Sequence, residues 1–297
     1  MATECARGSG LGCCGMGEGE PLTGGSDTQG IVRIGETVRR PLRPFSLTVQ
    51  AYLAHLRDVG FTGAPLPLGV DEQGREVLSF VPGEVHRHPV PPEAAGEDVL
   101  VALARLIRAL HEASAGWVPP PGAVWGGSPA NTGQVTERAE LVSHRDYATG
   151  NVVFRDGLPV ALIDFDLAKP TTRVYDIANA LWFWAPLKWG DPRDRPPALA
   201  EADIPHRVAV FADAYGMTAR QRAELTPLAV DIAHRYHEDS RASAELNPVW
   251  HEAWEGNKHT LSRAEAWVRE IAQRSPPASA SRASWGLRDS RRGVRGW

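Results

Sequence analysis

One segment constrains this chain more than any other: residues 144–166 read HRDYATGNVVFRDGLPVALIDFD. Two apolar, strand-like runs flank an Asp-Gly pair at 156–157, which is a strong signal for a tight hairpin turn because glycine accepts positive φ. Counting outward from that turn places Asn151 and Asp164 near the same open end of the hairpin. The loop before the first strand brings Asp146 to that end as well. The segment therefore predicts a hairpin whose open end gathers polar side chains.

Length and composition set broad limits on the rest. The chain has 297 residues, of which 42% are hydrophobic and 23% charged, as in an ordinary globular protein of one large or two closely packed domains. A net charge of −4 does not favour nucleic acid as a partner. The absence of a long apolar run predicts no membrane span, and the N-terminus lacks the apolar core of a secretory signal. Three cysteines, Cys5, Cys13 and Cys14, lack zinc-site spacing, so we expect free thiols and a cytoplasmic protein.

The pattern along the chain predicts an α+β fold of two lobes. The first lobe reads as short strands with one helix, and the second as mostly helices interrupted by the 144–166 hairpin. We expect a disordered leader at 1–18, a small β-rich lobe at 19–80, a Pro-Gly hinge at 81–84, a larger helical lobe at 85–274 and a disordered basic tail at 275–297.

Individual elements follow from periodicity and turn residues. IVRIGETVRR at 31–40 alternates and turns at Gly35, which predicts a hairpin, and 75–81 reads as a further strand. Apolar residues at helical spacing predict helices at 47–60, 96–116, 174–187, 203–215, 218–238 and 260–273.

The residues at the open end of the hairpin suit one kind of chemistry. Carboxylates together with an Asn carbonyl are hard ligands for Mg²⁺, which completes its shell with phosphate and water. A further Asp can orient and deprotonate an attacking hydroxyl. Metal-held phosphate beside such an Asp is the equipment of phosphoryl transfer. The alternative is that these acids are solvated loop residues at strand ends, but their spacing as a set favours the functional interpretation.

The order His144-x-Asp146-x₄-Asn151, followed by a hairpin and then IDFD at 163–166, resembles the aminoglycoside phosphotransferase (APH) branch of the kinase-like superfamily. The resemblance implies a bilobal protein-kinase-like fold that uses ATP and Mg²⁺. It implies that Asp146 is the catalytic base, that Asn151 and Asp164 hold Mg²⁺, and that Asp166 assists from nearby.

Two further motifs resemble helices of the same family. In VYDIANAL (174–181) the resemblance makes Asp176 a buttress for the catalytic loop, and LIRALHEA (106–113) is similar to the helix that carries His111. We expect His111 and His144 to be structural residues rather than reacting groups.

The small lobe departs from the family pattern. Gly24 and Gly25 precede a strand and could approach phosphates, although a plain turn is an equally good interpretation. EVLSFVPGE (76–84) does resemble the interlobe linker of the family, which implies that the backbone of Phe80 and Val81 meets the adenine ring. The phosphate-pairing Lys is absent, so Arg39, or else Arg40, is expected to replace it. The helix at 47–60 offers no Glu partner for that cation.

The acceptor is the least defined part. The resemblance implies a hydroxyl-bearing small molecule, such as an aminoglycoside-like antibiotic or a metabolite, bound near the C-terminal helices. Acidic residues in 237–256 could form a cationic amino-sugar pocket or a solvated helix face, and Arg145 is expected to pair with a local carboxylate. The alternative function is a kinase-like immunity protein that binds a toxin without transferring phosphate. The oligomeric state is left open.

Overall fold

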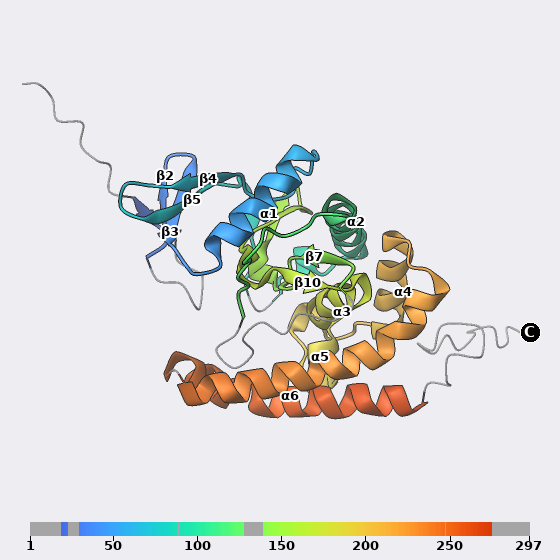
Figure 1. Cartoon of the computed structure of the whole chain (residues 1–297). Helices are drawn as coiled ribbons and strands as arrows, with labels where there is room; N and C mark the ends of the chain where they lie inside the picture. Colours follow the sequence, from blue (N-terminus) through green and yellow to red (C-terminus); the bar gives the residue numbers. More distant parts are fainter. Residues whose placement is uncertain (1–18, 23–29, 88–89, 128–138, 247, 275–297) are drawn as a thin grey trace, which may run out of the picture.

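The computed structural model describes residues 19–22, 30–87, 90–127, 139–246 and 248–274. The predicted leader at 1–18, the predicted tail at 275–297 and the glycines Gly24 and Gly25 lie outside these ranges. Figure 1 shows a small sheet with one helix beside it and a larger, mostly helical part, and the predicted 144–166 hairpin, here called the central hairpin, lies between α2 (Glu97–Ser114) and α3 (Arg173–Trp184) in the chain.

The N-terminal sheet has the strand order β1-β2-β3-β5-β4, and every pairing in it is antiparallel. Its strands are β1 (Glu20–Pro21), β2 (Val32–Ile34), β3 (Thr37–Pro41), β4 (Pro67–Val70) and β5 (Arg75–Ser79). The β2–β3 hairpin turns at Gly35, which has a φ of 59°, at the place predicted from the alternating pattern. Helix α1 (Ser46–Asp58) buries the apolar face Val49, Tyr52, Leu53 and Leu56.

The link between the two parts is anchored to the central hairpin. Strand β6 (Glu84–Val85) pairs with β8 (Val152–Arg155), which pairs with β9 (Leu158–Leu162). Gly83 immediately precedes β6 with a φ of 147°, and a Cβ at this position would lie 2.4 Å from the carbonyl oxygen of Phe154. Only glycine fits so close to the neighbouring backbone. The crossing between the two parts is therefore held against the hairpin.

The larger part contains the helices α2 (Glu97–Ser114), α3 (Arg173–Trp184), α4 (Ile204–Tyr215), α5 (Ala219–Leu246) and α6 (Pro248–Arg274). Two short strands, β7 (Leu141–Ser143) and β10 (Lys169–Thr171), pair antiparallel. Single turns of 3₁₀ helix lie at Pro92–Ala94, Thr149–Asn151, Phe165–Leu167, Leu187–Trp189, Pro192–Asp194 and Pro197–Leu199. None of the helices within the described ranges is long and apolar enough to cross a membrane.

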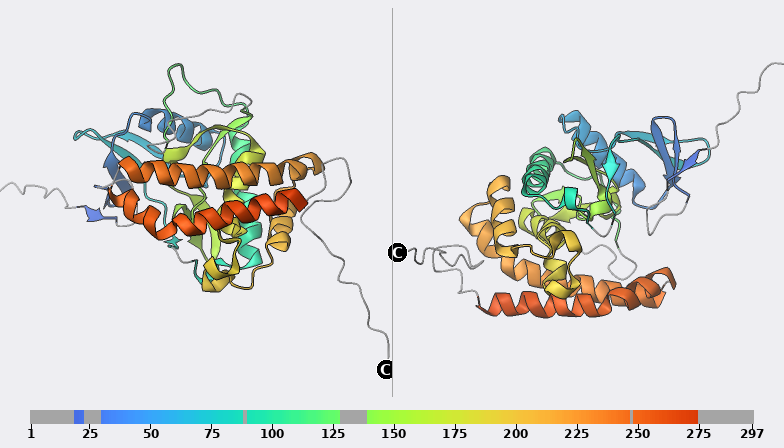
Figure 2. Two further views of the ribbon diagram at one scale, coloured as in Figure 1. Left: turned by 90° about the horizontal axis from the view of Figure 1, so that it is seen from below. Right: turned by 180° about the vertical axis from the view of Figure 1, so that it is seen from behind.

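The last two helices are longer than predicted. Helix α5 continues to Leu246 and α6 begins at Pro248, so most of the polar stretch between the two predicted helices is helical. Proline is favoured in the first turn of a helix because its missing N–H has no partner there in any case. Polar side chains in this stretch pair with one another along the helix, as Arg241 does with Glu238 and Glu245. Figure 2 shows α5 and α6 packed side by side.

Candidate active site

The central hairpin brings its polar residues together as counted from the sequence. Asp156 and Gly157 form the turn with φ values of 52° and 77°. Val152 pairs with Leu162 near the open end, and the Ile163 N–H donates to the Asn151 carbonyl at 2.9 Å. This backbone hydrogen bond joins Asn151 to Ile163, the residue before Asp164, and so holds Asn151 and Asp164 near each other.

Asp146 lies beside Asn151 and is oriented by it. The Asn151 side-chain amide donates to Asp146 Oδ2 at 2.7 Å, and the Ala148 N–H approaches Oδ1 at 3.4 Å. Burial raises the pKa of Asp146 above its ordinary value against an opposing effect of His144, and the negative charge of Asp164 adds to the rise. A carboxylate with a raised pKa that keeps part of its surface accessible is suited to accept a proton.

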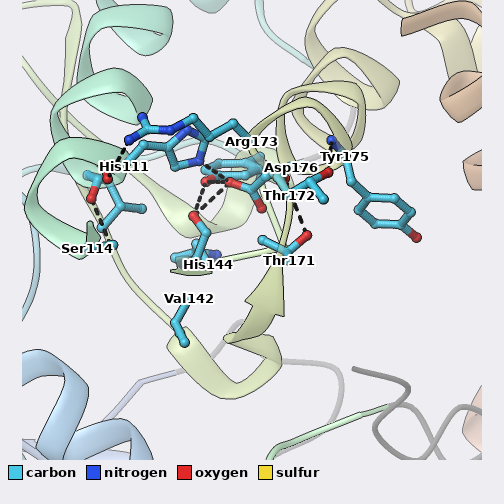
Figure 3. A network of polar contacts seen from close by, with 12 residues as sticks. His111, Ser114, Val142, His144, Thr171, Thr172, Arg173, Tyr175 and Asp176 are labelled. Atoms are coloured by element: carbon cyan, nitrogen blue, oxygen red, sulfur yellow. Dashed lines mark hydrogen bonds and ion pairs between the residues drawn. The ribbon is translucent and has the colours of Figure 1, made fainter. Parts of the chain in front are cut away.

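The loop that carries Asp146 is fixed by a buried carboxylate on α3. Asp176 Oδ2 accepts hydrogen bonds from His111 Nε2 and Ser143 Oγ, both at 2.7 Å, and from the hydroxyl of Tyr147 (Figure 3). Burial alone would raise the pKa of Asp176, but the bonds from His111, Tyr147 and Ser143 hold it below its ordinary value. Asp176 therefore stays ionised and binds Ser143 and Tyr147, which lie on either side of Asp146 in the loop.

His144 connects the catalytic loop to the segment that follows the hairpin. Its Nε2 donates to the Ile163 carbonyl at 2.8 Å, and its Nδ1 accepts from the Asp146 N–H at 3.2 Å. The ring is buried and lies 4.4 Å from the ring of Phe165. Both ring nitrogens are engaged with backbone groups, so His144 positions Asp146 and Asp164 relative to each other.

The small lobe contributes Arg40 to the acidic cluster, and Arg39 points elsewhere. Arg40 Nη2 lies 2.7 Å from Asp166 Oδ1, and Nη1 lies 3.3 Å from Asp164 Oδ1. Arg39 Nε instead lies 3.4 Å from Asp71 Oδ2. Successive side chains of a strand point to opposite faces, so only one of these two arginines can face the site. The structure brings Arg40, and not the expected Arg39, to the carboxylates Asp164 and Asp166.

A glutamate that the sequence did not reveal holds Arg40 in place. Glu76 on β5 is fully buried and lies opposite Arg40 in the sheet register, with Oε2 2.6 Å from Arg40 Nε. Ser46 Oγ and Gln50 Nε2 of α1 each donate to Glu76 at 3.2 Å. The signal for it was an acid followed by the apolar residues 77 and 78 in a strand, because an acid buried with them needs a cation as partner.

The site residues fit a magnesium ion. The side-chain nitrogen of Asn151 donates to Asp146, while its side-chain oxygen Oδ1 accepts no hydrogen bond from any described side chain or backbone group. Asp164 has a left-handed backbone with a φ of 63°, and 45% of its side chain is exposed. No cluster of three or more His, Cys, Asp or Glu side chains suited to a metal occurs among the described residues. Two protein oxygens, completed by phosphate and water, match the usual preference of Mg²⁺.

Asp166 lies beside the same ion-pair cluster. Burial and the charge of Asp164 raise its pKa to about 7, against the opposing charge of Arg40. The backbone here is tightly packed, because a Cβ on Gly126 would lie 1.8 Å from the Asp166 carbonyl oxygen. Asp166 is therefore enclosed by protein, whereas Asp164 remains partly open to solvent.

Of the two residues predicted to contact the adenine ring, Phe80 already uses its backbone N–H within the protein. The Phe80 N–H donates to the Glu36 carbonyl at 2.8 Å, and the guanidinium of Arg33 lies 3.7 Å from the centre of its ring. Phe80 can therefore offer only its carbonyl oxygen to a base. The Val81 N–H donates to no group in the described part of the chain.

Three of the acids expected to attract a cationic acceptor pair with basic residues of their own helix. Glu238 and Glu245 pair with Arg241, and Glu255 pairs with Lys258 at 2.6 Å. These ion pairs fit the second of the two interpretations of residues 237–256, a solvated helix face. Arg145, expected to pair with a carboxylate, forms no ion pair with any described residue and instead lies 4.6 Å from the ring centre of Tyr175.

Comparison with known sequences supports the motif assignment. Residues 129–225 match the model of the phosphotransferase enzyme family (APH). The chain is 33% identical over 259 residues to the trifolitoxin immunity protein of Rhizobium leguminosarum bv. trifolii, across 83% of this chain and 93% of that protein.

Solved structures of low sequence identity share the fold. A choline/ethanolamine kinase family protein from Mesorhizobium loti superimposes with a TM-score of 0.56 at 14% identity, covering 86% of this chain and 93% of that one. ADP-bound aminoglycoside phosphotransferase APH(2'')-Ib gives 0.51 at 11% identity, covering 86% and 95%. The gentamicin complex of APH(2")-IIa gives 0.50 at 11% identity, covering 90% and 93%. These likenesses confirm the predicted α+β, bilobal kinase-like fold.

Proposed function

The chain belongs to the phosphotransferase enzyme family, and from this premise we propose that it transfers the γ-phosphate of ATP to a hydroxyl group of a small molecule. Membership confirms the family and the phosphotransferase class predicted from residues 144–166. The observation that carries the proposal is the placement of Asp146, bonded to Asn151 at 2.7 Å, at the end of the hairpin that also presents Asp164.

Asp146 would act on the acceptor. Its carboxylate accepts the proton of the acceptor hydroxyl while the hydroxyl oxygen bonds to the γ-phosphorus, the bond from that phosphorus to the bridging oxygen breaks, and ADP leaves. The Asn151 amide holds Asp146 in one orientation, and the raised pKa of Asp146 strengthens it as a base. Asp176 keeps the loop in place through Ser143 and Tyr147.

Asn151 and Asp164 would hold Mg²⁺, which when bound neutralises charge on the nucleotide phosphates. Arg40 bridges Asp164 and Asp166, and this position beside the proposed metal ligand supports a role for its guanidinium in binding a nucleotide phosphate. We assign to Arg40 the role of the absent lysine and to Glu76 the role of its carboxylate partner. Because Glu76 is bonded to Ser46 and Gln50, helix α1 still supports the cation.

Replacing Arg40 with methionine is expected to weaken nucleotide binding by about tenfold or more, since a charge-assisted contact to a phosphate contributes about 1.5–3 kcal/mol. Arg39→Met is the matched control and is expected to bind nucleotide like the wild type, because Arg39 pairs with Asp71. Isothermal titration with Mg²⁺-ATP measures both. If Arg39→Met weakens binding more than Arg40→Met does, the original choice of Arg39 is right and this assignment is wrong.

The proposed reaction is tested with a panel of hydroxylated antibiotics and metabolites, in which product phosphate is measured with ATP and separately with GTP. Thermal unfolding first shows whether nucleotide binds, since a ligand present at 100 times its Kd stabilises the native state by about 2.7 kcal/mol. We expect stabilisation by Mg²⁺-nucleotide and transfer to at least one acceptor. Absence of any nucleotide-induced stabilisation would overturn the proposal.

A second function is favoured by one observation, the likeness to the trifolitoxin immunity protein over 93% of that protein's length. The chain would then protect a cell by binding a toxin, with or without phosphoryl transfer. Expression of the wild type and of Asp146→Asn in a toxin-sensitive cell separates these possibilities. Protection by both proteins indicates binding alone, protection by the wild type only indicates that transfer is needed, and protection by neither removes the immunity function.

A further inference from the structure

Lys169 on β10 is a buried cation with no hydrogen-bonded or ion-paired partner among the described residues. The residue is 5% exposed, and its ammonium group makes no hydrogen bond or ion pair with any residue in the described ranges. Burial of an unpaired charge costs several kcal/mol, so a fold keeps one only where another interaction offsets the cost. In the register of the short sheet, Lys169 lies opposite Ser143, two residues before Arg145.

Two arginines, Arg145 and Arg235, lie near Lys169. Arg145 lies over the ring of Tyr175 at 4.6 Å, and Arg235 on α5 is bonded to Asp231 at 2.7 Å. Burial lowers the pKa of Lys169 to about 8, with further lowering by the positive charges of Arg145 and Arg235. Figure 3 shows the ring of Tyr175 on the side of α3 away from the Asp176 network, so this cationic region is separate from the loop buttress.

The carboxylates nearby do not balance this charge. Asp231 is engaged with Arg235, and Asp239 acts on Lys169 through its charge. Tyr175 and Tyr236, which also lie beside Arg145, each have a pKa raised by burial and stay neutral. Three cations therefore face two carboxylates, which leaves one positive charge in excess.

We propose that Arg145, Lys169 and Arg235 form a binding site for an anionic group, a carboxylate or phosphate carried by a small molecule, next to the catalytic loop. The anion would supply the missing partner of Lys169 and accept charge-assisted hydrogen bonds from the two guanidinium groups. Its source is either an anionic group of the acceptor itself or a separate small anion that binds beside the acceptor. The site repels a polycationic acceptor in either case.

The site is tested by titrating inorganic phosphate, at constant ionic strength, into the wild type, Lys169→Met and Lys258→Met. Methionine matches the length and shape of lysine without its charge, and Lys258 is a solvent-accessible lysine paired with Glu255. Arg40→Met accompanies them, because phosphate could also bind at the nucleotide site. We expect phosphate binding in the wild type, Lys258→Met and Arg40→Met, and at least tenfold weaker binding in Lys169→Met.

The pH dependence gives a second readout. Since the pKa of Lys169 is lowered to about 8, phosphate binding is expected to weaken as the pH rises through that value in the wild type, with no such step in Lys169→Met. Equal phosphate affinity in the wild type and Lys169→Met, or no phosphate binding by the wild type, would overturn the proposal. Neither result requires turnover, so a failure of this site is distinct from a failure of the proposed function.

The two sources of the anion give different kinetics, and this arm rests on the proposed function. If the group belongs to the acceptor, Lys169→Met raises KM for anionic acceptors and leaves kcat and neutral acceptors unchanged. If it is a separate anion, added phosphate changes turnover of a neutral acceptor in the wild type and has no effect in Lys169→Met.

Discussion

Replacing Asp146 with asparagine is expected to slow phosphoryl transfer by about 10²–10⁴-fold, the usual contribution of a positioned general base. Asparagine has the same shape as aspartate and can still contact Asn151, but it cannot accept the proton of the acceptor hydroxyl. The burial that raises the pKa of Asp146 also disfavours its charge, so the neutral substitution is not expected to unfold the protein.

Single-turnover measurements with saturating nucleotide and acceptor isolate this effect from binding. Asp156→Asn is the matched control, because Asp156 is an exposed acid of the same hairpin and asparagine tolerates its φ of 52°. Asp156→Asn should transfer phosphate at the wild-type rate. Equal rates for Asp146→Asn and the wild type would remove Asp146 from the chemistry.

Replacing Asp176 with alanine is expected to lower the free energy of unfolding by about 3–5 kcal/mol, the usual cost of removing one partner from a buried ionic network. Three buried donors, on His111, Ser143 and Tyr147, would lose their common acceptor. Because two of these residues lie on either side of His144 in the catalytic loop, turnover should fall together with stability.

Urea unfolding measures the change, with Asp213→Ala as the control. Asp213 pairs with Arg222 at the surface, where such a pair contributes about 0–1 kcal/mol. The pKa of Asp176 is lowered in the native state, so its stabilisation is present above the unfolded pKa of about 3.9 and is lost as the pH falls through the lower native value. The difference between wild type and Asp176→Ala should therefore shrink in strong acid. A loss below about 1 kcal/mol at neutral pH would contradict the role of Asp176.

The hairpin and its polar end were predictable because the signals are local. A turn at Asp156 and Gly157 and an alternating strand pattern fix which residues meet at the open end, so the neighbourhood of Asp146, Asn151 and Asp164 follows from counting. The bilobal fold was predictable for a related reason, since strand-like segments are confined to the first lobe and the central hairpin.

The cation of the small lobe was not predictable in the same way. Alternation shows that Arg39 and Arg40 face opposite sides of β3, but only packing against α1 and the hairpin decides which side meets Asp164. Glu76 is 36 residues from Arg40 in the chain, and their contact depends on the pairing of β3 with β5. The partner of the cation was expected on the helix at 47–60, whereas Glu76 lies on a strand.

Contacts made by the C-terminal helices were equally hidden. The position of Arg145 over Tyr175 depends on how the loop after β7 packs against α3, and the position of Lys169 near Arg235 depends on how β10 lies relative to α5. Long-range packing of this kind has no local pattern in the sequence. The acids of 237–256 suggested a pocket for a cationic acceptor, because composition alone does not show that Glu238 and Glu245 are paired with Arg241.

The most direct test of nucleotide-dependent phosphoryl transfer is ³¹P NMR of Mg²⁺-ATP incubated with the acceptor panel and either wild type or Asp146→Asn. We expect the γ-phosphate signal to decline with the wild type while a phosphomonoester signal grows in equal amount, and both changes to be nearly absent with Asp146→Asn. A γ-phosphate signal that stays constant with the wild type, or a phosphomonoester that forms at the same rate with both proteins, would contradict catalysis by Asp146.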